Sequence, residues 1–167
     1  MTKFTLFGAL ALATTVALPA IAQMPAPTPA EFVMKAGASD KFEISEAKLM
    51  MNSKNADIRS FATKIISDHT KSTNMVKTAA MKDGMTPKPP MLDSMQQSNL
   101  AQLTAAKGTA RDALYVSQQK PAHQDALMLM QTYSSAGTAT HLKDAATQIT
   151  PVVQMHIDML NKMPMAM

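Results

Sequence analysis

Three of the four histidines lie where a helical period of 3.6 residues turns side chains towards the interior, each on a different predicted helix. They are His69, His123 and His156. Glu43 lies beside the inward face of a further predicted helix. Three imidazoles and one carboxylate form a ligand set that suits Zn, Fe or Cu. The sequence therefore predicts a candidate metal site at these four residues, and it identifies no separate catalytic group and no organic cofactor site.

Two further polar residues share a predicted helix with His123, since Tyr115 and Gln119 precede it by two turns and one turn. From there they could orient the imidazole rings behind the metal ligands. A second interpretation stays open, because a buried histidine often needs one hydrogen-bond partner and no metal. Asp68, Gln119 and Tyr115 are the candidate partners in that case. The fourth histidine, His141, is predicted to be exposed.

The level of each candidate ligand along a helical bundle follows from the rise of 1.5 Å per residue. We expect the turn between the first two long helices and the turn between the last two to lie at the same end. Measured from that end, Glu43 and the three histidines fall at about 15 to 25 Å. This spread of about 10 Å is comparable to side-chain reach and to the error in helix ends. The four residues are therefore expected to share one layer.

Two other patterns bear on metal chemistry. Glu43 and Glu46 are three residues apart on one predicted helix, and we expect Glu43 to lean inward and Glu46 to be solvated. The seventeen methionines include two loose groups, at 81–95 and 155–167. Thioethers are ligands for Cu(I), but methionine more often fills irregular helical cores.

The first helix that positions these residues is marked by a capping box. Thr28 is its N-cap, Pro29 its first residue and Glu31 the reciprocal partner. We expect this helix to reach about residue 52. Its predicted inward face consists of Val33, Ala36, Asp40, Ile44, Ala47 and Met51.

The other predicted helices are separated by glycines and prolines. Gly84 ends the second helix, Gly108 ends a short third one, and Pro121 and Pro151 are expected to kink the last two. The fold class is therefore all-α: a four-helix bundle with a short extra crossing helix between its second and third long helices. The predicted segments are 55–83, 93–107, 109–134 and 139–163.

The N-terminal segment is typical of a secretory signal peptide. A basic Lys3 is followed by an apolar run and by the small-x-small pattern that ends at Ala22. Cleavage near Ala22 predicts a periplasmic or secreted protein, with association with the outer membrane left open. The mature chain has no apolar run long enough to span a membrane. The predicted organisation is a signal peptide at 1–22, a Pro-rich leader at 23–29, a helical bundle at 30–163 and a Met-rich tail at 164–167.

Composition excludes several classes of function. The formal net charge is +4, the lysines are scattered and there are only two arginines, so nucleic-acid binding is not expected. The chain has no cysteine, no Gly-x-Ser-x-Gly motif, no Gly-rich phosphate loop and no His-Glu-x-x-His motif. These absences disfavour the common hydrolases. Whether the protein is an enzyme stays open, and a protein without enzymatic activity is favoured.

Several short motifs, taken in order, resemble domain of unknown function family 4142, a group of exported bacterial proteins. The resemblance covers about residues 31–162 and implies a ferritin-like four-helix bundle, without supplying a function. One departure is Arg111, where the family commonly has an aromatic residue. The motifs are Glu43-Ile44 leading to Leu49, Phe61-Ala62 leading to Asp68-His69, Asp112 with Tyr115, Gln119 with His123, and Pro151 with His156.

A second departure concerns the metal chemistry that a ferritin-like fold suggests. Di-iron proteins of this type carry Glu-x-x-His on two helices. Here the residues three before the inward histidines are Ile66, Lys120 and Val153, so a di-iron oxidase is disfavoured.

The functional prediction is an exported helical bundle that binds a metal ion or another envelope component, in a role linked to envelope stress. One alternative is a mononuclear metal oxidoreductase that uses the same residues, which would need an open coordination position. The other is a passive structural or interaction protein of the cell envelope, which an exposed apolar face on either of the last two long helices would favour.

Overall fold

The protein is described by a computed structural model that covers residues 25–163. The predicted signal peptide at 1–22 and the tail at 164–167 lie outside this range. The described residues form helices and no strand, which confirms the all-α class. The helices are α1 (Pro29–Met50), α2 (Ala56–Lys82), α3 (Ser94–Ala105), α4 (Gly108–Ala136) and α5 (Thr140–Lys162).

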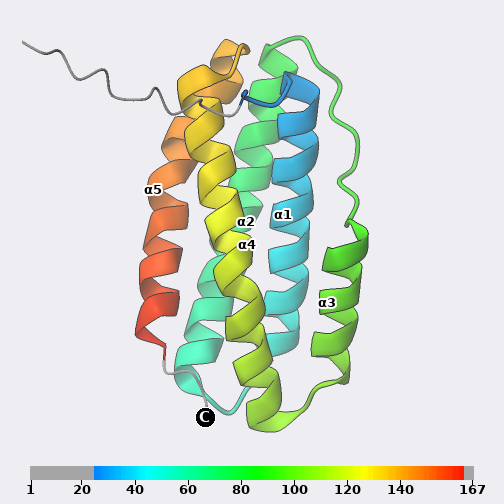
Figure 1. Cartoon of the computed structure of the whole chain (residues 1–167), viewed down its shortest axis with the longest axis vertical. Helices are drawn as coiled ribbons and strands as arrows, with labels where there is room; N and C mark the ends of the chain where they lie inside the picture. The colour runs from blue at the N-terminus through cyan, green and yellow to red at the C-terminus, as the bar shows by residue number, and fades with distance from the viewer. Residues whose placement is uncertain (1–24, 164–167) are drawn as a thin grey trace, which may run out of the picture.

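Four long helices pack side by side, and the shorter α3 lies outside them (Figure 1). α1 packs against α2 and α4, and α5 packs against α2 and α4. The additional helix predicted between the second and third long helices is present as α3. Figure 1 shows α3 running along the bundle beside α1 rather than across it.

The two turns that we expected at one end of the bundle lie at opposite ends (Figure 1). Near the α1–α2 turn, Ser53 donates a hydrogen bond to Asp112 in the first turns of α4 (2.8 Å). At the other end, Asp83 after α2 accepts hydrogen bonds from the first turn of α5. The prediction was wrong because α3 carries the chain back along the bundle, so that α2 and α4 run in the same direction.

The helix ends follow their local sequence. The capping box of Thr28 and Glu31 is confirmed. Gly84 adopts a φ of 77°, and the next amide donates to the Ala80 carbonyl (2.9 Å), the arrangement in which a glycine ends a helix. The break at Gly108 is also confirmed, since α4 begins there with a φ of 59°. α4 continues through Pro121, and α5 continues through Pro151.

The core consists of two apolar clusters with a polar layer between them. The cluster near the α4–α5 turn includes Phe32 and Tyr133, whose rings stack at 3.9 Å. The cluster near the α1–α2 turn includes Phe61 and Tyr115. Between the clusters, each long helix contributes buried polar side chains. The most buried of these are Asp40, Glu43, Glu46, His69, Gln119, His123 and His156.

The predicted inward face of α1 was partly wrong. Ala36, Asp40 and Ala47 are buried, but Val33 and Ile44 are only partly buried and Met51 is exposed. The true face includes three carboxylates, which weakens the apolar period that the prediction relied on. Three buried residues were missed, and Glu43 and Phe32, placed beside the predicted face, are buried as well. The missed residues are Phe42, Glu46 and Met50.

Candidate metal centre

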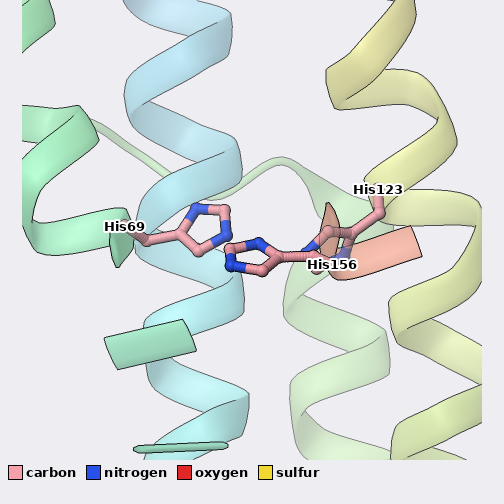
Figure 2. Close-up of side chains that lie close together, drawn as sticks. All are labelled: His69, His123 and His156. Carbon is pink, nitrogen blue, oxygen red and sulfur yellow. The ribbon is translucent and has the colours of Figure 1, made fainter. Parts of the chain in front are cut away.

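Three imidazole rings meet in the polar layer, each carried by a different helix. His69 lies on α2, His123 on α4 and His156 on α5, and Figure 2 shows their side chains directed towards one another. Their ring centroids are 5.3 to 5.5 Å apart. One ring nitrogen of each lies within 4.8 Å of one nitrogen of each of the others. All three residues are at most 3 % exposed.

Each imidazole is held from behind by one hydrogen bond to an oxygen. His69 Nδ1–H donates to Asp40 (2.7 Å) and His156 Nε2–H donates to Asp68 (3.0 Å). His123 Nδ1–H donates to the backbone carbonyl of Gln119 (3.0 Å). Because ionised carboxylate and carbonyl oxygens only accept, each of these bonds places a proton on the bonded nitrogen. The other nitrogens, Nε2 of His69 and His123 and Nδ1 of His156, have no hydrogen-bond partner among the described residues.

Glu43 on α1 completes the layer. Its Oε2 lies 2.7 Å from His69 Nε2 and 3.7 Å from His123 Nε2, while Ser39 donates to its Oε1 (3.0 Å). The 2.7 Å contact lacks hydrogen-bond geometry, so both atoms remain without such a bond. Glu43 therefore touches two of the three histidines, and its side chain is fully buried.

The charges in this layer are unequal. Burial lowers the pKa of His123, and it lowers that of His156 to about 4, so both rings are neutral at pH 7. Burial opposes charge on His69 too, but Glu43 and Asp40 outweigh it and raise its pKa to about 10. Burial would likewise raise the pKa of Glu43, but His123 and His69 lower it to about 2. Without metal, His69 is thus an imidazolium beside two buried acidic groups.

A second group of polar side chains lies next to the histidines, one turn after Glu43 on α1 and one turn before His123 on α4. Our expectation that Glu46 is solvated was wrong: it is fully buried, and Gln119 Nε2 donates to its Oε2 (2.9 Å). Burial raises the pKa of Glu46 to about 7, whereas Glu43, one turn away, stays ionised. Gln119 thus holds His123 by its backbone and Glu46 by its side chain. The Tyr115 hydroxyl is buried and bonds to none of the histidines among the described residues.

Sequence reasoning assigned some supporting residues and missed others. Asp68 and Gln119 were proposed as histidine partners, and both contact an imidazole. Asp40 and Ser39 were missed as partners, although Asp40 lay on the predicted inward face of α1. A charged residue on such a face, three residues before Glu43, was the signal that pointed to it. Thr73 on α2 donates to the second oxygen of Asp40 (2.9 Å) and holds that carboxylate in place.

Several members of the two methionine groups are exposed. Met81, Met91 and Met95 are more than half exposed, and Met155 is 36 % exposed. The last two methionines lie outside the described residues. The Cu(I) interpretation of these groups stays a prediction. The ring of Phe61 lies 6.1 to 6.2 Å from the rings of His156 and His123 and forms an apolar boundary of the centre.

Comparison with known proteins establishes the family. The family model described as "Domain of unknown function (DUF4142)" matches residues 14–163. The chain belongs to the DUF4142 family. This confirms the resemblance drawn from the motifs around Glu43, His69, His123 and His156. No curated protein matches the chain.

One solved structure from a second family, DUF305, has a fold similar to that of this chain. It is a crystal structure of a DUF305 fragment from Deinococcus radiodurans, with a TM-score of 0.70. The two are 17 % identical, and the match covers 83 % of this chain and 96 % of that one. At this identity the similarity concerns the fold alone.

Among residues 25–163, no helix is both long enough and apolar enough to cross a membrane.

Proposed function

We propose that this protein binds a divalent first-row transition metal ion at the centre of its bundle. The ligands are Nε2 of His69, Nε2 of His123, Nδ1 of His156 and Oε2 of Glu43. Zn, Fe and Cu suit this combination of three imidazoles and one carboxylate. The bundle is of the ferritin-like type that the family resemblance implies, but its donor set is that of a single metal ion.

One observation carries the proposal: each imidazole forms one hydrogen bond that points away from the centre, and the three rings are directed towards one another beside the Glu43 carboxylate (Figure 2). A single buried histidine with one hydrogen-bond partner needs no metal ion to account for it. This does not explain three imidazoles that meet beside a buried carboxylate, two of them within 3.7 Å of it. Acceptors behind each ring are the usual support of metal-binding histidines.

Binding is favoured over turnover of a substrate. The four proposed ligands are at most 3 % exposed, and with Glu43 the donor set is complete for tetrahedral coordination, as in closed structural sites. Two surface cavities, of about 460 and 480 Å³, are lined by none of the four. A mononuclear metal oxidoreductase stays the alternative, and it would need an additional path to the ion.

A passive structural role receives no support from the exposed apolar side chains. Among the described residues, the exposed large hydrophobic side chains are all methionines, distributed over every helix, the α1–α2 turn and the α2–α3 connection. α4 and α5, the helices on which we looked for an apolar face, carry Met128 and Met155 respectively. Isolated apolar side chains are ordinary on a protein surface.

We place this binding outside the cytoplasm, in the periplasm or the medium, with outer-membrane association open. The support is the pattern of residues 1–22, which predicts cleavage near Ala22. A role in envelope stress would follow from holding a metal ion in that compartment. Cell fractionation and N-terminal sequencing of the mature protein test this location. An N-terminus at Met1 in protein from the cytoplasm would contradict it.

Metal content tests the proposed function directly. The protein is purified from the periplasm, and its metal is measured by mass spectrometry beside that of a His69→Ala/His123→Ala variant. His141→Ala is the matched control, because His141 is exposed and contacts Asp83 instead of the histidines of the centre. We expect about one metal ion per chain in the wild type and the control, and a negligible amount in the double variant. Metal-free protein that binds no Zn²⁺, Co²⁺ or Cu²⁺ on titration would overturn the proposal.

A further inference from the structure

The three groups that hold the imidazoles from behind differ in their access to solvent. The Asp40 side chain is 5 % exposed and Gln119 is fully buried, whereas the Asp68 side chain is 18 % exposed. Asp68 lies on α2 and its partner His156 on α5, so their contact lies between these two helices. Among the described residues, Asp68 is therefore the group that touches an imidazole of the centre and also reaches the surface.

We propose that Asp68 is the residue through which metal ions enter the centre, between α2 and α5. This inference rests on the proposed metal-binding function. Only one side chain separates Asp68 from the centre: His156 contacts Asp68 through Nε2, and its Nδ1 is one of the three inward nitrogens. A cation bound at the Asp68 carboxylate is thus one imidazole away from its final ligands.

The surface side of Asp68 carries a competing charge. Lys64 Nζ lies 3.0 Å from the same carboxylate oxygen that His156 contacts, and its side chain is 37 % exposed. Lys64 is one turn before Asp68 on α2, so it can leave the carboxylate without any change in the backbone. An incoming divalent cation must displace this ammonium. The ion pair therefore gates the route: Asp68 attracts the metal ion, and Lys64 opposes it.

This arrangement predicts opposite effects for the two halves of one ion pair. Asp68→Asn removes the attracting charge and should slow the association of Zn²⁺ with the metal-free protein about tenfold. Lys64→Gln removes the opposing charge and should accelerate association several-fold. Both substitutions break the same ion pair, so a role in stability alone would move both rates in the same direction.

The test uses stopped-flow transfer of Zn²⁺ from a fluorescent chelator to the metal-free mature chain. Asp83→Asn is the matched control, because Asp83 contacts an exposed histidine, His141, that is not part of the centre. We expect Asp83→Asn to leave association within about twofold of the wild type. Circular dichroism confirms that each variant is folded, and titration gives its stoichiometry.

The possible results separate the two proposals. If the wild type binds Zn²⁺ stoichiometrically and loses it on removal of the histidines, the metal site stands. Equal association rates in all variants, or equal slowing by Asp83→Asn and Asp68→Asn, would then overturn the entrance at Asp68 alone. If the wild type takes up no Zn²⁺, Co²⁺ or Cu²⁺, both proposals fail together.

Discussion

Two histidine–aspartate pairs in this bundle have nearly the same geometry and opposite surroundings. In the central layer, His69 Nδ1 lies 2.7 Å from Asp40. At the end of the bundle where α2 ends and α5 begins, which we call the α2–α5 end, His141 Nδ1 lies 2.6 Å from Asp83. The His69 side chain is 4 % exposed and that of His141 is 47 % exposed. A short distance between a histidine and a carboxylate therefore does not distinguish a candidate metal site from a surface pair.

The other contacts of each pair make the distinction. His69 turns its second nitrogen towards Glu43, His123 and His156. Asp83 instead accepts hydrogen bonds from the amides of His141 and Leu142 (3.2 and 3.0 Å), the second and third residues of α5. The N-cap residue of α5, Ala139, provides no side-chain cap. The surface pair thus caps a helix, whereas the central pair orients a ring towards other donors.

The largest expected effect is stabilisation by metal that depends on the central histidines alone. At a Zn²⁺ concentration 1,000 times its Kd, the native state should gain about 4 kcal/mol. We expect this gain in the wild type and in His141→Ala, and none in His123→Ala. Thermal unfolding with and without Zn²⁺ measures it. A gain in His123→Ala equal to that of the wild type would remove the contrast between the two regions.

The second effect concerns Glu46, a buried glutamate in the central layer that has no equivalent in the His141–Asp83 pair. Burial raises the pKa of Glu46 from 4.5 in the unfolded chain to about 7. Below pH 4.5 both states are protonated, and between 4.5 and 7 the folded state holds the additional proton. Stability is therefore lost as the pH rises through this window, by up to about 3 kcal/mol above pH 7.

Glu46→Gln keeps the contact with Gln119 and removes this loss. In metal-free protein, the free energy of unfolding of the variant should equal that of the wild type at pH 4.5 and exceed it by up to about 3 kcal/mol at pH 8. Urea unfolding over this range measures the difference, and titration of the histidines cancels between the two proteins. A difference that does not change with pH would show that Glu46 titrates as in the unfolded chain.

The third effect compares the two aspartates directly. Asp40→Asn weakens the acceptor that orients His69, and loss of such a partner typically reduces metal affinity 10- to 100-fold. Asp83→Asn makes the same chemical change at the surface pair and should leave the affinity unchanged. Competition against a chelator of known affinity measures both variants. Equal effects of the two substitutions would mean that the Asp40 contact has no special role at the centre.

The sequence predicted the apolar helices better than the polar one. α2 has a clear apolar period, and most of the inward residues that this period predicts, Ile58, Phe61 and Ile65 among them, are buried. Ile66 and Thr73, which it also predicts, are only partly buried. α1 buries three carboxylates, Asp40, Glu43 and Glu46, which interrupt its apolar period. The period there was therefore read in the wrong register, and Glu46 was placed in solvent.

The shared level of the histidines was predicted from an incorrect topology. We placed both turns at one end, whereas α3 reverses the chain and places them at opposite ends. The predicted common level of the three histidines was nevertheless correct, because their rings lie near the middle of the bundle. His69 and His123 are both about 20 Å from the starts of α2 and α4, which run in the same direction. Individual contacts, such as that of Glu43 with His69, depend on helix rotation and could not be predicted from sequence.

The smallest expected effect tests the surface pair on its own terms. Asp83→Ala removes the acceptor for the second and third amides of α5 and should cost about 1 kcal/mol of stability, as the loss of an N-cap does. His141→Ala keeps the backbone hydrogen bonds to Asp83 and removes an exposed pair, so it should cost less than about 0.5 kcal/mol. Urea unfolding of the two variants separates these values. Because the cap lies at the end of the bundle, both costs should be the same with and without Zn²⁺. A cost of Asp83→Ala that changed with bound metal would couple the α2–α5 end to the centre and make the two regions one system.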